Sequence, residues 1–201
     1  MILPVSTPKL VRLHLQENEI THQLTSNICN LKNLTYLNLR ESTLDDNQLS
    51  LIIDNCKKLI VLDISYIDEL TDVSLRNTTS LPHLECLGVG FNQDFTDAGF
   101  VILSGNLKML DVSHTNISNN AILMILRKMQ SLKQLDLSFL EDLDMSFVES
   151  AIEIVRRRSN NIQLKVDLLD TPIDVEEIRN TCPLIKFEYG SVRFDFYNYV
   201  K

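Results

Sequence analysis

The residues that could carry catalytic chemistry do not form a catalytic pattern. Asp111, Ser113 and His114 lie close together in the chain. Successive side chains of a strand point to opposite faces, so these three cannot form a Ser-His-Asp triad. The four histidines are scattered, and no two stand four residues apart as a helical metal pair would. Gly88-Val89-Gly90 lacks the third glycine of a phosphate-binding loop. The sequence therefore predicts a protein that is not an enzyme and needs no metal or other cofactor.

Carboxylates and aromatic rings, in contrast, recur at matching positions. An aspartate follows an apolar residue in four short apolar segments, at Asp63, Asp111, Asp136 and Asp167. A row of carboxylates repels itself and favours a partner that carries lysine or arginine. Rings stand three residues after this position in four consecutive segments, at Tyr66, Phe91, His114 and Phe139. Exposed rings supply much of the affinity of protein interfaces, so both sets are predicted to bind a basic or aromatic-accepting protein surface.

Two glycines interrupt these sets in the middle of the chain. Gly88 takes the place of the aspartate, and Gly90 stands beside Phe91. Both positions lack a side chain, so we expect a dent here, flanked by aromatic and acidic groups, as the centre of recognition. Two other interpretations stay open: the aspartates are ordinary solvated parts of a common segment, and the rings fold down onto the core.

The elements that must position these residues follow from a repeated apolar skeleton. Leu132, Leu135 and Leu137 are spaced by two residues and then by one, and five earlier segments share this spacing. The first leucines stand at 10, 34, 59, 84, 107 and 132, which are steps of 23 to 25 residues. A fixed period of this length with this spacing is typical of a leucine-rich repeat. Two degenerate repeats follow, around Val166 and Phe187.

The residues between these segments have helical spacing. Leu49, Ile52, Ile53 and Cys56 stand at positions i, i+3, i+4 and i+7 of one helix face, and similar runs follow the fifth and sixth segments. Residues 144–158 are expected to form a helix that ends in three solvated arginines, Arg156 to Arg158. The helix after the third segment is expected to be short, because Asn77, Thr78 and Thr79 interrupt its apolar face.

We therefore predict a right-handed α/β leucine-rich-repeat solenoid of about eight repeats, with a parallel sheet on the concave face and helices on the convex face. Residues 1–201 would form a single leucine-rich-repeat domain. It divides into an N-terminal edge (1–9), the repeats (10–189) and an aromatic C-terminal capping strand (190–201). The last part contains Phe194, Phe196, Tyr197 and Tyr199. Its rings either cover the last repeat or dock on a partner.

The repeats resemble those of a known family. Leu70-Thr71-Asp72-Val73-Ser74-Leu75, Phe95-Thr96-Asp97-Ala98-Gly99-Phe100 and Asn55-Cys56-Lys57-Lys58-Leu59 are similar to the cysteine-containing leucine-rich repeat of the F-box/leucine-rich-repeat proteins. Those proteins are substrate receptors of cullin-type ubiquitin ligases. The resemblance implies substrate recognition in a ubiquitin-ligase complex. Residues 1–9 are too few for an F-box, so any contact with a cullin-ligase adaptor would need sequence outside this chain.

The same repeats depart from that family at one position. Its members place a cysteine after the strand, where this chain has other residues, namely Ser42, Ile67, Asn92, Thr115 and Leu140. A scaffold or assembly factor outside the ubiquitin pathway is therefore the first alternative function. The second is a GTPase-activating regulator that uses one of the arginines at 156–158.

Composition narrows the compartment and the partners. The formal charge of −8, from 27 acidic and 19 basic residues, argues against binding to nucleic acid. No run of residues is long and apolar enough for a membrane span, and residues 1–5 do not resemble a signal peptide. The four cysteines lack the spacing of a zinc site or a disulfide framework. Cys56 and Cys182 are expected to be buried and reduced, which suits the cytoplasm or the nucleus.

Overall fold

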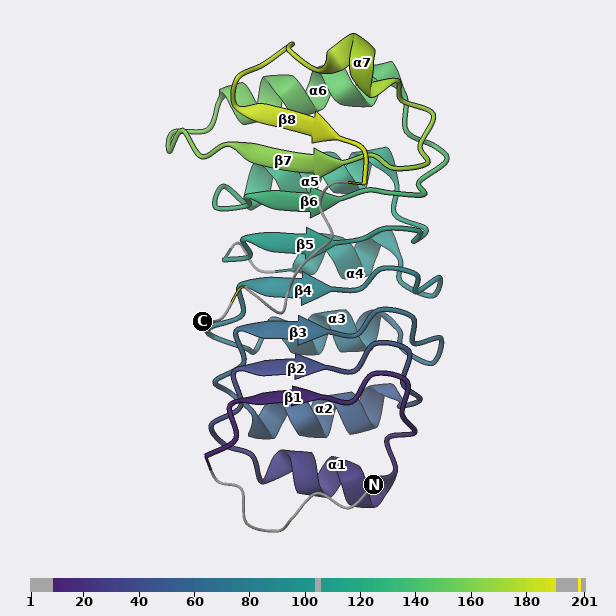
Figure 1. The fold of residues 1–201 in the computed structure, drawn as a ribbon, viewed down its shortest axis with the longest axis vertical. Coiled ribbons are helices and arrows are strands. Elements are labelled where there is room, and N and C mark those ends of the chain that lie inside the picture. Colours follow the sequence, from purple (N-terminus) through teal and green to yellow (C-terminus); the bar gives the residue numbers. More distant parts are fainter. Residues whose placement is uncertain (1–8, 104–105, 191–198, 200–201) are drawn as a thin grey trace.

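A single parallel sheet runs through the whole array. The computed structural model describes residues 9–103, 106–190 and Tyr199. Eight parallel strands pair in chain order from β1 to β8 (Figure 1). The strands are β1 (Arg12–His14), β2 (Tyr36–Asn38), β3 (Val61–Asp63), β4 (Cys86–Gly88), β5 (Met109–Asp111), β6 (Gln134–Asp136), β7 (Leu164–Asp167) and β8 (Ile185–Glu188).

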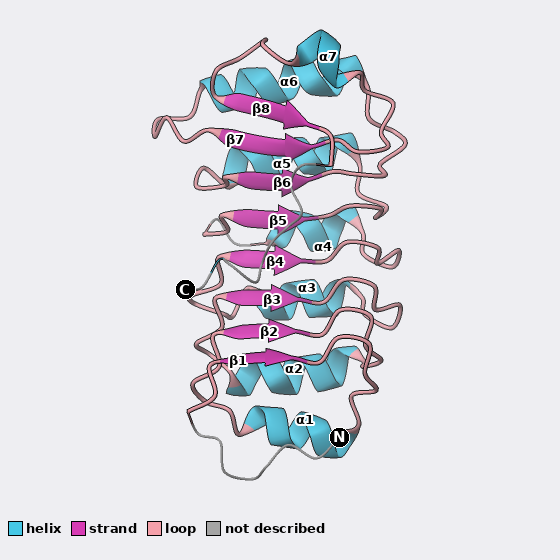
Figure 2. Ribbon diagram, in the orientation of Figure 1, coloured by secondary structure: helices cyan, strands magenta, loops and turns pink. Residues whose placement is uncertain are grey.

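Helices α1 to α6 cover one face of this sheet, and the short α7 lies at its β8 end (Figure 2). The opposite face, turned away from the helices, is called the open face below. The helices are α1 (His22–Cys29), α2 (Asp46–Asn55), α3 (Asp72–Thr78), α4 (Asp97–Ile102), α5 (Asn119–Lys128), α6 (Met145–Arg156) and α7 (Val175–Ile178).

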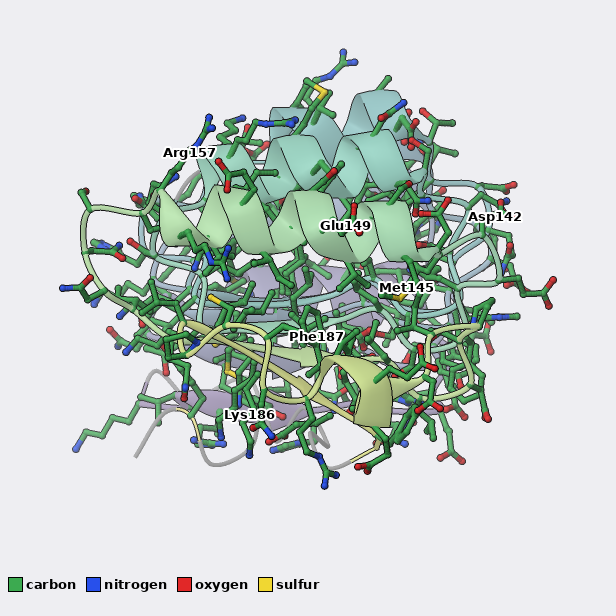
Figure 3. All side chains as sticks on the ribbon, turned by 90° about the horizontal axis from the view of Figure 1, so that it is seen from above. Asp142, Met145, Glu149, Arg157, Lys186 and Phe187 are labelled. Carbon is green, nitrogen blue, oxygen red and sulfur yellow. The ribbon has the colours of Figure 1, made fainter. Side chains whose placement is uncertain are left out.

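The apolar skeleton of the repeats forms the core between sheet and helices. Leu62, Leu87, Leu110 and Leu135 pair in register across β3 to β6, and each is at most 1% exposed. This confirms the predicted stack of the second apolar position. The strand alternation continues to the last repeat, where Phe187 points toward the helices and Lys186 away from them (Figure 3).

Neighbouring repeats are joined at the starts of their helices. Asp72, the first residue of α3, accepts hydrogen bonds from the amide (2.8 Å) and hydroxyl (2.5 Å) of Thr96, the N-cap residue of α4. Asp97, the first residue of α4, binds the amide and hydroxyl of Ser118 in the same way. The aspartate of each Thr-Asp pair therefore anchors the N-cap residue of the next helix. Thr71 also caps α3 through its hydroxyl, whereas Thr96 makes no side-chain capping bond.

The helices differ from the prediction at one end. The third helix is short as expected, but α6 ends at Arg156 and the three arginines are not all solvated. Arg158 is 4% exposed, and its guanidinium donates to the carbonyls of Leu132 (2.9 Å) and Met129 (3.4 Å). The expectation of a fully solvated helix end was wrong for Arg158, because its side chain points inward and binds the loop between α5 and β6.

The remaining predictions concern the cysteines and the two ends. All four cysteines are free, and Cys56 and Cys182 are buried as predicted. Burial raises the pKa of the Cys56 thiol to about 11. Among the described residues, no helix is long and apolar enough to cross a membrane. Residues 1–8 of the N-terminal edge, and 191–198 and 200–201 of the proposed capping strand, lie outside the described residues.

Candidate functional site

The predicted site residues gather where the strands end. Seven loops connect the ends of β1 to β7 to the following helices, at the arrowheads of Figure 1, and we call this side of the molecule the arrowhead edge. The ends of parallel strands meet at one edge of a sheet, so residues 25 or so positions apart in the chain become neighbours here.

The aspartate row (Asp63, Asp111, Asp136 and Asp167) is held inward by the backbone. Asp63, Asp111 and Asp167 are between 1% and 7% exposed, and Asp136 is half-buried. Each carboxylate accepts a hydrogen bond from the amide two residues later, at 2.9 to 3.1 Å. The aspartates therefore fix the turn that ends each strand, an arrangement that short acidic side chains favour.

At the end of each of these turns, one residue has a left-handed backbone conformation. The residue three positions after each aspartate has a positive φ, for example 59° at Tyr66, 48° at His114 and 62° at Phe139. Its amide can donate to the neighbouring repeat, as that of Tyr66 does to the carbonyl of Gly90 (2.9 Å) and that of Phe139 to the carbonyl of Leu169 (2.8 Å). Left-handed conformations cost energy for residues other than glycine, so the aspartate turn and the inter-repeat bonds together maintain them.

Two members of the aspartate row influence each other. Burial, and then the neighbouring Asp136, raise the pKa of Asp111. Burial also raises the pKa of Asp136, with a further contribution from Asp167. Asp111 and Asp136 are register partners on β5 and β6, so their carboxylates face the same low-dielectric region.

The expected dent at the glycines is filled on one side. A Cβ atom at Gly90 would lie 2.5 Å from the hydroxyl of Ser113 and 2.8 Å from a carboxylate oxygen of Asp111. Gly90 thus makes room for the aspartate turn of the next repeat, and the space beside it is not free for a partner's side chain. Gly88 is buried in β4.

The four rings form a continuous aromatic ladder (Tyr66, Phe91, His114 and Phe139). Tyr66 and Phe91 stack, with ring centroids 4.0 Å apart and planes at 11°. Phe91 also contacts His114 (4.8 Å) and Phe139 (5.6 Å). The guanidinium of Arg40 lies 4.2 Å above the ring of Tyr66 and extends the ladder by one repeat. The positive φ at each of these four positions brings the rings together across the loops.

The aromatic ladder lies outside the hydrophobic core. Tyr66, Phe91 and Phe139 are half-buried against one another, His114 is exposed, and none belongs to the buried core cluster. A pocket of about 370 Å³ adjoins the ladder between the loops after β5 and β6, and His114, Phe139, Glu141 and Asp142 are among its lining residues. The structure therefore offers rings and exposed carboxylates together on one surface.

Acidic and basic residues are segregated between the loops at the two edges of the sheet. This segregation was not predicted from the sequence. The seven loops of the arrowhead edge contain twelve carboxylates and one lysine or arginine, Arg40. The seven loops on the opposite edge, between each helix and the next strand, contain eight lysines or arginines and one carboxylate, Glu85. Figure 3 shows Asp142 and Arg157 on opposite edges. The signal was present in the sequence, but it appears only when charges are sorted by loop type.

The acidic loop residues are distinct from the aspartate row. Unlike that row, most of them extend into solvent and belong to the turns between strand and helix. The twelve are Glu17, Glu19, Glu41, Asp45, Asp68, Glu69, Asp94, Glu141, Asp142, Asp144, Asp170 and Asp174. No group of three or more His, Cys, Asp or Glu within the described residues is arranged to hold a metal ion.

Comparison with known proteins agrees with the architecture. No protein-family model and no curated protein sequence matches the chain. Among solved structures, it is similar to an internalin C2 from Listeria monocytogenes, with 23% identity and a TM-score of 0.58 over 90% of this chain and 72% of that one. At this identity the likeness shows the fold alone: the chain is a leucine-rich-repeat solenoid.

Proposed function

We propose that the chain is a protein-binding module that recognises a basic partner through its arrowhead edge. The observation that carries the proposal is the aromatic ladder, in which three half-exposed rings and an imidazole form a continuous series of contacts among twelve loop carboxylates. Monomeric proteins rarely expose a contiguous group of aromatic rings unless that surface binds a partner. Aromatic residues also contribute much of the binding free energy at protein interfaces.

The two kinds of residue have different roles in this proposal. The exposed carboxylates, such as Glu141 and Asp142, attract a lysine- or arginine-bearing surface and increase its association rate. Phe91 and Phe139 contribute most of the affinity, because partner contact removes their remaining exposed surface from water. The aspartate row acts indirectly. Asp63, Asp111 and Asp136 hold the turns that precede the rings at 66, 114 and 139, and Asp167 holds the corresponding turn before Asp170. Gly90 leaves room for the turn at Asp111.

The narrower form of the proposal is substrate recognition in a ubiquitin-ligase complex of the cytoplasm or nucleus. The similarity of the Leu70–Leu75 and Phe95–Phe100 segments to the F-box/leucine-rich-repeat family supports it, and four free cysteines fit a reducing compartment. The alternative is a scaffold or assembly factor with the same binding edge. A GTPase-activating role has less support, since Arg156 donates to the carbonyl of Thr181, Arg157 pairs with Glu153 and Arg158 is buried.

Site-specific photo-crosslinking tests the proposal. A photoreactive amino acid replaces Gln93, an exposed residue that lines the pocket beside the aromatic ladder. A matched variant carries the same group in place of the exposed Lys58, on the opposite edge. We expect a protein of basic surface to crosslink at position 93 and not at position 58, and Phe91→Ala with Phe139→Ala to abolish that crosslink. Equal crosslinking at both positions, or a crosslink insensitive to the loss of both rings, would contradict the proposal.

A further inference from the structure

A second apolar cluster lies on the open face of the sheet. Its members, Tyr36, Val61, Cys86 and Met109, are the first residues of β2 to β5 and are register partners. They form a cluster separate from the core beneath the sheet, yet each is at most 6% exposed. The corresponding residues of β6 to β8 are Gln134, Lys165 and Lys186, so the apolar stripe is confined to one part of the face.

Tyr199 packs on this open-face cluster. Its hydroxyl donates to a carboxylate oxygen of Glu85, 114 residues earlier in the chain, at 2.8 Å. Its ring is half-buried against the cluster and lies next to the Cys86 thiol. β8 ends only eleven residues before Tyr199, so this residue has returned four strands along the sheet to reach β4.

The site has the chemistry of a tyrosine receptor. The apolar side chains accept the ring, and Glu85 accepts the phenolic hydrogen. Lys108 donates to the other oxygen of Glu85 at 2.5 Å and holds that carboxylate in place. Burial and Glu85 raise the pKa of Tyr199, so the site selects the neutral phenol. A phenylalanine would leave Glu85 without this donor, whereas a tyrosine satisfies both halves of the site.

We propose that the open-face cluster is a binding site for a tyrosine side chain of a partner protein, and that Tyr199 occupies it until such a partner competes. The occupant within the chain shows which side chain fits. The described contacts of Tyr199 are its ring packing on the cluster and its hydrogen bond to Glu85, and a second tyrosine can make the same two contacts. Lys133, exposed at the start of the neighbouring strand β6, favours an acidic residue beside the incoming tyrosine. This surface and its partner chemistry are distinct from those of the arrowhead edge.

The thiol of Cys86 reports whether the site is covered. The chain of residues 1–201 is treated with a maleimide, and modification of each cysteine is followed by mass spectrometry. The half-exposed Cys29 on α1 is the internal reference. In the wild type Cys86 should react slowly, and Tyr199→Ala should accelerate its modification by about tenfold, the factor that corresponds to roughly 1.4 kcal/mol of lost ring contact. Tyr199→Phe, which keeps the ring, should stay closer to the wild type.

A peptide then tests binding in trans. A synthetic peptide of residues 191–201, added to the Tyr199→Ala variant of the 201-residue chain, should slow Cys86 modification again, and the same peptide with Tyr199→Ala should not. Circular dichroism and thermal melting confirm that each variant is folded. Unchanged Cys86 reactivity in Tyr199→Ala, or equal protection by both peptides, would overturn the proposal. Neither result depends on the aromatic ladder, so the proposed function stands or fails separately.

Discussion

The aspartate at the end of β5 has two opposed effects on this molecule. Asp111 accepts hydrogen bonds from the amide (2.9 Å) and hydroxyl (2.6 Å) of Ser113 and so secures the turn that aims His114. The same carboxylate is buried beside Asp136, and its charged form is disfavoured there. An asparagine keeps the acceptor oxygen and removes the charge, so the two effects can be separated by one substitution.

The pH dependence of stability follows from the raised pKa values of Asp111 and Asp136. Between the ordinary aspartate pKa near 4 and neutral pH, the folded state binds more protons than the unfolded state, so the free energy of unfolding falls as pH rises. We expect Asp111→Asn to raise the free energy of unfolding at pH 8 by about 1 to 2 kcal/mol, with the gain disappearing toward pH 4. Urea denaturation at both pH values measures it. A gain of equal size at both would show that charge is not the cause.

The aromatic ladder and the core should respond differently to truncation. Leu110→Ala removes a fully buried side chain and should cost about 2 to 5 kcal/mol of unfolding free energy. Phe91→Ala with Phe139→Ala removes half-buried rings that belong to no core cluster, and we expect a smaller loss for the pair than for Leu110 alone. Thermal melts of the two variants decide between these cases. A larger drop for the ring pair would mean that the rings are structural.

For individual residues, the sequence identifies which side chains become neighbours at the ends of the strands but not whether they are buried or exposed. The fixed period places Asp111 beside Asp136 and Phe91 beside His114, as the register confirms for the aspartates and the ring contacts for the aromatics. Burial of the aspartates could not be predicted, because it depends on the local turn and on the positive φ that follows it. The filled space beside Gly90 has the same cause.

Besides the shared hydrophobic core, hydrogen bonds between the starts of neighbouring helices hold adjacent repeats together. Asp72 receives two hydrogen bonds from Thr96, and the backbone passes so close that a Cβ atom at Gly99 would lie 2.2 Å from a carboxylate oxygen of Asp72. We expect Asp72→Ala to cost about 0.5 to 1.5 kcal/mol, because Thr96 loses two hydrogen bonds and its exposed amide and hydroxyl bind water instead. Asp68→Ala, an exposed acidic residue in the preceding loop, is the matched control. Equal melting temperatures for the two variants would argue against this role.

Most elements could be predicted because each repeat must bury the same apolar set. The strands around Val166 and Phe187 form despite their degenerate spacing, since neighbouring strands supply the register. The end of α6 could not be predicted, because Arg158 satisfies carbonyls of an earlier repeat, 26 and 29 residues away, that local sequence does not reveal. The open-face cluster corresponds to four apolar residues at one strand position of the sequence, but their role as a binding site depends on the contact with Tyr199, which the sequence does not reveal.

In the molecule as a whole, the segregation of charge makes one edge of the sheet acidic and the opposite edge basic. Acidic loops lie at the arrowhead edge and basic loops at the other. For a basic partner we expect the association rate to fall as salt concentration rises, and Glu141→Gln with Asp142→Asn to reduce that rate and its salt dependence. Lys57→Gln with Lys58→Gln on the opposite edge should not slow association. Stopped-flow or surface plasmon resonance at several salt concentrations measures both, and a slower rate for the lysine variant would contradict the assignment of the edge.

The role of the aromatic ladder in binding can be measured from the dissociation rate of a partner that crosslinks at position 93. The wild type is compared with the Phe91→Ala, Phe139→Ala variant by surface plasmon resonance at one salt concentration. We expect dissociation to be about tenfold faster for the variant, with an association rate that changes little, because ring contacts form after the charges have oriented the partner. An unchanged dissociation rate in a folded variant would show that the aromatic ladder does not bind the partner.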